Sequence, residues 1–296
     1  MKKNLRSDDI KAGWVFIIPT LVFLSLTSLL PLVYAFTVSF TNYDIKQPNQ
    51  TLQFVGFRNY AVGLKDSEFI TSVKNTILIV GVSLALEFII GLVLSLILSK
   101  ERKGYSVWRT ILLIPSVIAP VVVGVLWRML LNPDYGLFKL WFDKIGLNKA
   151  WLSDPIWAKI TVIMVETWTW TPFVMLTLVA GLKSLSDTPF EAARIDGASG
   201  WQIFRYITMP MLKPVIAVTF LLRLMDAFKM FDNIYVLTYG GPGLATEVLS
   251  LRIYKKGLKY FDISVASAQS WVFLLCIFIL SYIVAKKFVD VESRLR

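Results

Sequence analysis

The sequence contains no histidine and only one cysteine, Cys276, in 296 residues. Without histidine the chain lacks the usual general base for activating a nucleophile, the usual proton shuttle and the commonest zinc ligand. A single cysteine inside an apolar run provides neither a disulfide framework nor a thiolate metal site. We therefore expect no metal centre.

The signature motifs of catalysis are missing as well. No Gly-x-x-x-x-Gly-Lys-Ser/Thr phosphate loop, Gly-x-Ser-x-Gly elbow or His-Glu-x-x-His helix occurs. Asp226 and Asp232 could suggest an intramembrane aspartyl protease, but six residues separate them by about 240° on an α-helix, so they should not converge. The sequence predicts a protein that is not an enzyme and binds no cofactor. Any ATP must be used by a partner.

Hydrophobic residues make up 56% of the chain, whereas ordinary globular proteins contain about 45 to 50%. This composition predicts an all-α integral membrane protein. A span needs about 20 apolar residues. Six such helices are expected, and the fifth would be underestimated by hydropathy because it carries charges; the spans are residues 13–40, 73–98, 111–131, 160–182, 215–237 and 266–284.

The first span follows a basic segment, residues 1–12, and could be mistaken for a secretory signal. Its apolar stretch is much longer than the roughly 7 to 15 residues of a signal sequence, so an uncleaved span is expected. The formal charge of +11 is dispersed between apolar spans, which argues against nucleic-acid binding. Residues 1–296 are interpreted as one membrane domain.

Orientation follows from the distribution of Lys and Arg, which are enriched in cytoplasmic connections. With both termini inside, the inner segments hold more of these residues than the outer loops do. The sequence therefore predicts an N-in, C-in, multi-pass protein. This orientation places the connection at residues 183–214 in the cytoplasm.

Two spans carry polar residues at helical spacing. Charged groups inside a bilayer usually face a bundle interior or a wet cavity. Each set recurs at i, i+3, i+4 and i+7, so it should form one face of its helix, and Arg223 can pair with Asp226. The two faces are Glu166, Thr169, Trp170 and Phe173 in the fourth span, and Arg223, Asp226, Ala227 and Met230 in the fifth.

Aromatic rings beside carboxylates and hydroxyls suit a polyhydroxylated ligand such as a sugar, because the rings stack on C–H faces while the polar groups bind hydroxyls. The alternative is that these groups hold helices together or belong to an interfacial aromatic belt. Glu87, alone in the second span, is interpreted as an interhelical hydrogen-bonding group.

The cytoplasmic connection contains the segment EAARIDGASGWQIFRYITMP, residues 191–210. Pro189 and Glu191 are typical of a helix start, and Gly197 and Gly200 permit a bend before a second amphipathic helix. This short, partly apolar helix pair has no core of its own and is expected to dock against another surface. A plain connector lying on the lipid surface is the alternative.

These residues resemble the EAA signature of the membrane-spanning subunits of bacterial ABC importers. The match consists of Glu191, Ala192 and Ala193, then Gly197, then Ile207 to Pro210, with Met209 in place of the usual leucine. Further residues resemble the carbohydrate-importer branch typified by the maltose permease MalF: Phe16 to Pro19, Pro31, Phe54 to Gly56, Asn59, Tyr60, Thr238, Gly240 to Pro242, Ile253 and Tyr254.

The resemblance implies a permease in the bacterial cytoplasmic membrane that works in binding-protein-dependent sugar transport by alternating access. Its implied partners are a second, similar but different permease chain, a cytosolic ATPase dimer that uses ATP and Mg, and an extracytoplasmic solute-binding protein. Glu191, Ala192, Ala193, Gly197, Ile207 and Pro210 would form the coupling segment that docks on the ATPase. Relatives tend to use amides where this chain has Glu166, Arg223 and Asp226.

Two alternative functions stay open at the level of sequence. An ABC permease for a non-sugar solute would use Arg223 to bind an anion. An ion-coupled carrier or channel would use the intramembrane charges without any ATPase.

Overall fold

The computed structural model describes residues 7–47, 51–100, 104–144, 146 and 149–293. Throughout these residues the regular structure is helical, apart from one isolated bridge between Thr41 and Phe54. The prediction of an all-α protein is confirmed. The basic residues 1–6 lie outside the described part of the chain.

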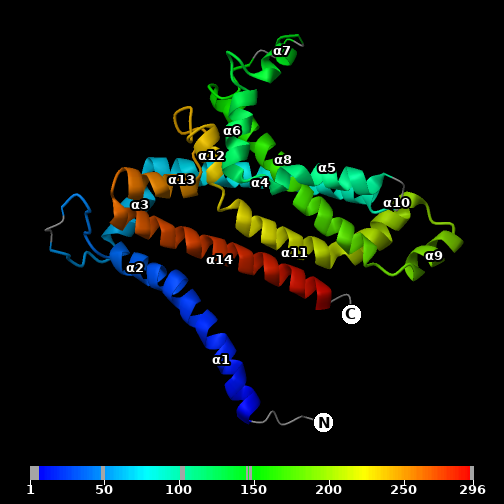
Figure 1. Cartoon of the computed structure of the whole chain (residues 1–296), viewed down its shortest axis with the longest axis horizontal. Helices are drawn as coiled ribbons and strands as arrows, with labels where there is room; N and C mark the ends of the chain where they lie inside the picture. Colours follow the sequence, from blue (N-terminus) through cyan, green and yellow to red (C-terminus); the bar gives the residue numbers. More distant parts are fainter. Residues whose placement is uncertain (1–6, 48–50, 101–103, 145, 147–148, 294–296) are drawn as a thin grey trace. The chain divides into compact units, whose positions relative to one another are not determined.

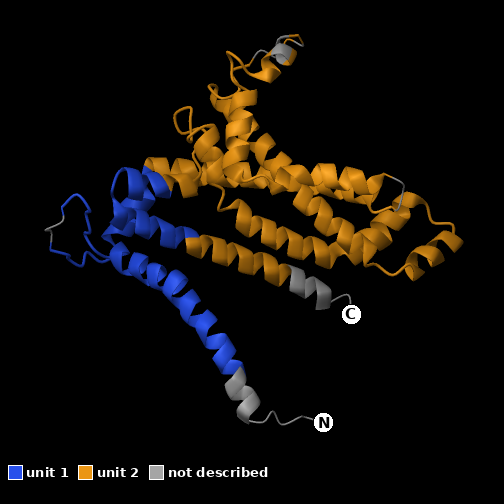
Figure 2. Cartoon of the chain, viewed as in Figure 1, with its two compact units in different colours: residues 1–66, 253–273 blue, residues 67–252, 274–296 orange. Residues whose placement is uncertain are grey.

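The chain divides into two compact units, shown in Figure 2. Unit 1 comprises residues 1–66 and 253–273, and unit 2 comprises residues 67–252 and 274–296. The assignment of residues 1–296 to one membrane domain stays a prediction. Figure 1 labels the helices.

Unit 1 begins with one long helical stretch formed by α1 (Ser7–Leu24), a π-helical turn η1 (Ser25–Leu29) and α2 (Leu30–Ser39). After a loop come α3 (Arg58–Lys65), the π-helical turn η3 (Lys255–Lys259) and the start of α14 (Ile263–Ser293). The loop is fixed at its base by Asn59, whose amide donates to the carbonyls of Ser39 and Thr41, both at 2.8 Å. Residues 14–30 are exposed throughout within this unit.

Unit 2 is built on two long helices that pack against each other, α4 (Ser67–Leu98) and α8 (Pro155–Lys183). Gly91 lies at their contact, where an added Cβ would be 2.8 Å from a methyl of Val174. Small residues let membrane helices approach closely. The remaining elements are α5 (Tyr105–Val117), α6 (Pro120–Leu130), α7 (Leu137–Lys144), α9 (Thr188–Ile195), α10 (Gly200–Ile203), η2 (Phe204–Thr208), α11 (Met209–Ala227), α12 (Asp232–Leu237) and α13 (Leu249–Tyr254).

Among the described residues, five helices are long and apolar enough to cross a membrane, or six if a bent pair counts as one span. The five are residues 13–39, 67–98, 155–183, 200–227 and 263–287. The bent pair is α5 and α6, which meet at 96°. Ile118 and Ala119 between them are extended, as expected for residues before Pro120. The predicted third span, 111–131, is therefore a broken one.

The fifth span differs most from its prediction. The helix runs from Gly200 to Ala227, whereas the sequence predicted 215–237. Its beginning was missed because Pro210 suggests a helix end. The π-helical turn η2 instead leads directly into α11, and such local π adjustments let a membrane helix continue through a proline. Its end was missed because residues 228–231 contain neither glycine nor proline. The chain nevertheless leaves the helix there and restarts as α12.

Candidate functional site

A buried arginine lies at the centre of unit 2. Arg223 projects from α11, and its side chain is 1% exposed. Its Nε donates to Oε2 of Glu87 at 2.8 Å, and its Nη2 donates to Oε1 of the same carboxylate at 3.0 Å. This two-pronged pair joins α11 to α4, in the geometry that a planar guanidinium favours.

Two further carboxylates complete the cluster. Nη2 of Arg223 also donates to Oε1 of Glu166 on α8 at 2.5 Å, and Nη1 donates to Oδ2 of Asp226 at 3.0 Å. The second oxygen of Glu166 accepts from the amide of Asn233 on α12 at 2.8 Å. The guanidinium carbon lies 4.6 Å from the centre of the Trp170 ring. We call Arg223, Glu87, Glu166, Asp226 and Asn233 the arginine cluster.

The arginine cluster joins α4 and α8 to the consecutive helices α11 and α12. Glu87 and Glu166 are buried, with 0% and 2% of their side chains exposed. A buried charge without a partner is strongly destabilising, so each carboxylate depends on the guanidinium. The pair Arg223–Asp226 expected from the sequence is present, and Glu87 makes the interhelical hydrogen bond expected of it.

A polar cavity of about 100 Å³ adjoins the arginine cluster. Its lining comes from α6, α8, the break after α11 and the start of α12. We call it the polar cavity. The residues that line it are Pro120, Val123, Glu166, Thr169, Trp170, Asp226, Lys229, Met230, Phe231, Asp232 and Asn233.

Some residues of each of the two helix faces predicted from sequence spacing line this cavity. Five of the eight candidates line it: Glu166, Thr169, Trp170, Asp226 and Met230. Arg223 lies behind the wall within the cluster. Phe173 packs instead beside the apolar cluster of Val174, Leu178 and Leu212, and Ala227 is fully buried.

Lys229 and Asn233, which were not among the candidates from sequence, also line the cavity, and so does Asp232, which was considered only as a partner of Asp226 and set aside. Continuing α11 as a regular helix would have turned Asp232 away from Asp226. Since α11 ends at Ala227, this expectation is wrong, and both carboxylates line one cavity. The only available signal was the concentration of charges after Arg223, because no breaker residue marks the end of the helix.

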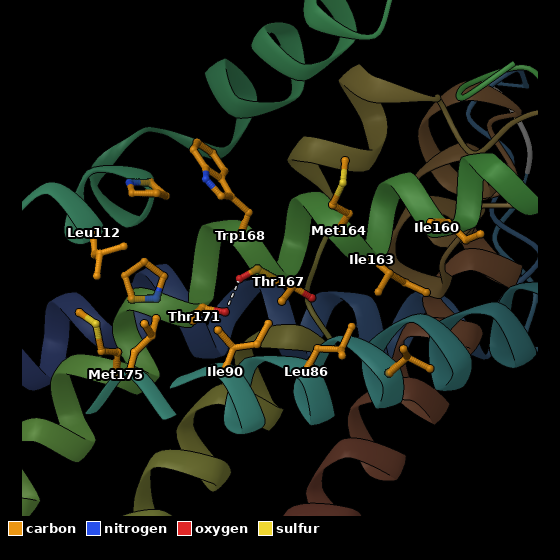
Figure 3. A pocket seen from close by; sticks show the side chains of 14 residues that line it. Leu86, Ile90, Leu112, Ile160, Ile163, Met164, Thr167, Trp168, Thr171 and Met175 are labelled. Carbon is orange, nitrogen blue, oxygen red and sulfur yellow. Dashed lines mark hydrogen bonds between the residues drawn. The ribbon is translucent and has the colours of Figure 1, made fainter. Parts of the chain in front are cut away.

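A larger cavity of about 640 Å³ lies between α4, α5 and α8. Figure 3 shows Leu86, Ile90, Met164 and Met175 around it, with Trp168 at one side. Its polar side chains are two threonines, of which Thr171 already donates to the carbonyl of Thr167 at 2.6 Å. Such a lining suits hydrocarbon and offers almost nothing to a hydroxylated ligand.

The segment predicted to dock on a partner has a well-defined form. It lies at the end of unit 2 where α8 ends and α11 begins (Figure 1). Gly197 has a φ of +74°, which favours glycine, and the amide of Ala198 donates to the carbonyl of Ala193 at 2.9 Å. Ser199 and Gln202 form a capping box that starts α10.

This segment exposes apolar side chains. Ile195 and Trp201 are 86% and 66% exposed. Of the predicted coupling residues, Glu191, Ala192 and Gly197 are exposed and Ala193 is buried, while Ile207 in η2 and Pro210 in α11 are half-buried. The exposed positions are those of α9 and the following turn.

Known proteins resemble the chain over most of its length. The family described as binding-protein-dependent transport system inner membrane component matches residues 87–291. The trehalose/maltose transport system permease protein MalF of Thermococcus litoralis is 38% identical over 252 residues, which covers 85% of each chain.

Two solved structures share the fold. One is a bacterial ABC transporter involved in the import of the acidic polysaccharide alginate, with a TM-score of 0.83, 25% identity and coverage of 96% of this chain and 98% of the other. The second is a bacterial alginate ABC transporter in complex with a periplasmic protein that carries an alginate pentasaccharide, with a TM-score of 0.81, 25% identity and coverage of 94% of each chain. Given the length of the family match and the identity to the permease relative, this chain belongs to the inner membrane components of binding-protein-dependent transport systems, and is a multi-pass transport subunit.

Proposed function

We propose that the chain is the permease subunit of an ATP-driven importer for a sugar or related polyhydroxylated solute. The relative from Thermococcus litoralis is named for trehalose and maltose, and the structural relatives are named for alginate. The polar cavity supports the same class of cargo, because it combines the ring of Trp170 with hydroxyl and carboxylate groups. Its volume is smaller than that of typical ligand pockets. One chain would therefore supply only part of the sugar site.

The proposed assembly contains three kinds of partner. A second permease, similar but different, would complete the sugar site. A cytosolic ATPase dimer would use ATP and Mg, because the sequence of this chain contains no phosphate loop of its own. A solute-binding protein outside the bacterial cytoplasmic membrane would deliver the cargo, as the complex with a periplasmic protein suggests by analogy.

The observation that carries the proposal is the continuity of α8. This helix holds Glu166 at the polar cavity and ends at Lys183, shortly before α9. Glu166 and Lys183 are separated by about 25 Å along the helix axis. A helix is stiff enough over this length to link a push on α9 to a rearrangement around the cavity, which is the requirement for alternating access.

In this mechanism the coupling residues would act through the complementary shapes of α9 and the ATPase surface. Ala192 and the turn at Gly197 allow close approach of the ATPase, and Glu191 places a carboxylate in the first turn of α9. Closure of the ATPase dimer would move α9, open the permease pair toward the outside and admit the sugar. ATP hydrolysis would then reset the transporter.

The test is a Gly197→Val variant of the complete transporter. A side chain at positive φ is strained, so the turn should change and the docking of α9 should fail. We expect ATP-dependent uptake of a radiolabelled sugar to fall by more than about tenfold while the amount of assembled subunit stays the same. The matched control is Gly104→Val, also at positive φ (+88°) with open space around it. Normal uptake by Gly197→Val would sink the proposal.

The ion-coupled alternative makes a different prediction. It requires uptake to continue when the ATPase is removed or carries an inactivating substitution. Membership of a binding-protein-dependent family argues against it.

A further inference from the structure

From the polar cavity we infer that the permease discriminates by charge and excludes anionic sugars in favour of uncharged ones. The inference rests on the proposed function and narrows its substrate class. It argues against the alternative, left open by the sequence, in which Arg223 binds an anionic solute.

The guanidinium of Arg223 is not available to a ligand. Its three nitrogens all donate to carboxylates, at 2.5 to 3.0 Å. The side chain is 1% exposed, and the Trp170 ring stacks beside the guanidinium. An anion entering the cavity therefore finds no free guanidinium to bind.

The groups that do face the cavity are mainly acceptors. The side chain of Asp226 is 51% exposed although one oxygen is paired with Arg223, and Asp232 is exposed as well. Glu166 has both oxygens occupied, by Arg223 and Asn233. Lys229 is the one cation among the residues that line the cavity, and two aspartates lie three residues to either side of it in sequence.

This arrangement penalises an anion and accommodates hydroxyl groups. Like charges repel each other strongly where solvent screening is reduced, so a ligand carboxylate beside Asp226 or Asp232 would be repelled. Ionised carboxylates only accept hydrogen bonds, and a sugar hydroxyl can donate to them. Trp170 then offers a flat apolar face for the sugar ring.

Charge selectivity can be measured without knowing the sugar. The background is the complete transporter in nanodiscs with Cys276→Ser in this chain. Phe231, which is half-buried in the cavity wall, is replaced by cysteine. Its modification by three methanethiosulfonate reagents, one cationic (trimethylammonioethyl), one anionic (sulfonatoethyl) and one neutral (methyl), is followed by the mass of this subunit, with and without ATP and vanadate.

We expect the cationic reagent to outpace the anionic one by roughly tenfold at Phe231→Cys, after correction for their rates with a free thiol. Adding Asp232→Asn should reduce that ratio. The control is Tyr135→Cys, which is 72% exposed and does not line the polar cavity, where the ratio should match the free thiol. Equal or faster modification of Phe231→Cys by the anionic reagent would overturn the inference. Failure of even the neutral reagent in every condition would also overturn it, because a cavity closed to small solutes cannot select cargo.

A second measurement separates this inference from the proposed function. ATP-dependent uptake of maltose, glucosamine and glucuronate is compared in the same complex. Uptake that continues when the ATPase carries an inactivating substitution speaks against the proposed ATP-driven importer, whatever the reagents show. Efficient glucuronate uptake leaves sugar import intact and refutes the exclusion of anions.

Discussion

At the scale of single residues, the guanidinium of Arg223 binds two buried carboxylates from different helices, Glu87 of α4 and Glu166 of α8, and also Asp226 of its own helix. The i, i+3 spacing was sufficient to pair Arg223 with Asp226, because both lie on one helix. Glu87 lies 136 residues away from Arg223, and no local pattern connects positions on different helices. The sequence could therefore predict that Arg223 is a functional candidate. Its pairing with Glu87 becomes visible only in the structure, where α4 packs against α11.

Removing the guanidinium should be costly. In Arg223→Met, Glu87 and Glu166 lose their shared partner while buried, and we expect a loss of about 3 to 5 kcal/mol in the free energy of unfolding. The measurement is the thermal unfolding of the purified transporter by fluorescence. Adding Glu87→Gln and Glu166→Gln to Arg223→Met removes both charges and should recover part of the loss.

The control for this prediction is Lys229→Met, which removes an exposed cation from the same region. Its unfolding temperature should stay close to that of the original chain. If Arg223→Met unfolded at the same temperature as this control, the arginine cluster would not be stabilising the helix arrangement.

At the scale of elements, apolar length located the long helices well and helix ends badly. α4 and α8 contain the predicted spans 73–98 and 160–182, each extended by several residues at its start. The break after Ala227 was invisible because Phe228, Lys229, Met230 and Phe231 are all compatible with a helix. This break brings Asp226 and Asp232 to one cavity.

The contact between α4 and α8 should depend on Gly91. An alanine Cβ there would lie 2.8 Å from Val174 Cγ1 and 3.2 Å from the backbone nitrogen of Met175. The helices must separate, so we expect Gly91→Ala to cost about 1 to 3 kcal/mol, seen as a lower unfolding temperature.

Gly81→Ala provides the comparison, since it lies in the same helix and an added Cβ meets nothing within 4 Å. This variant should be neutral or slightly stabilising, because alanine favours helix over glycine. Equal unfolding temperatures for the two variants would contradict the close approach at Gly91.

At the scale of the whole molecule, composition and charge predicted the class of protein, and among the described residues up to six helical segments are long and apolar enough to span a membrane. Their orientation across the membrane is a prediction from the distribution of Lys and Arg. For the first span, the sequence predicted the length of the helix but not the burial of its side chains. Its apolar length was read correctly, but nothing in its composition indicated that residues 14–30 would be exposed throughout within their own unit.

The orientation can be tested with single cysteines in the Cys276→Ser background. With both termini inside, Tyr135→Cys should react with a membrane-impermeant maleimide on intact cells. Ser186→Cys, close to α9, should react only after the cells are opened.

The reverse labelling pattern would show that the topology is inverted and that α9 lies outside the cytoplasm, where no ATP is available to a partner ATPase. Labelling of both positions on intact cells would instead indicate that the cells had leaked, which a cytoplasmic marker protein detects in the same samples.

The arginine cluster also has a consequence for how such sequences can change over generations. Loss of Arg223 alone passes through a form in which two buried carboxylates, Glu87 and Glu166, lack their shared cationic partner. We therefore expect related proteins to carry either charged residues at all three positions or uncharged residues at all three, with few intermediate combinations. When related genes are aligned, we expect these three positions to change together, while neighbouring lipid-facing positions drift independently.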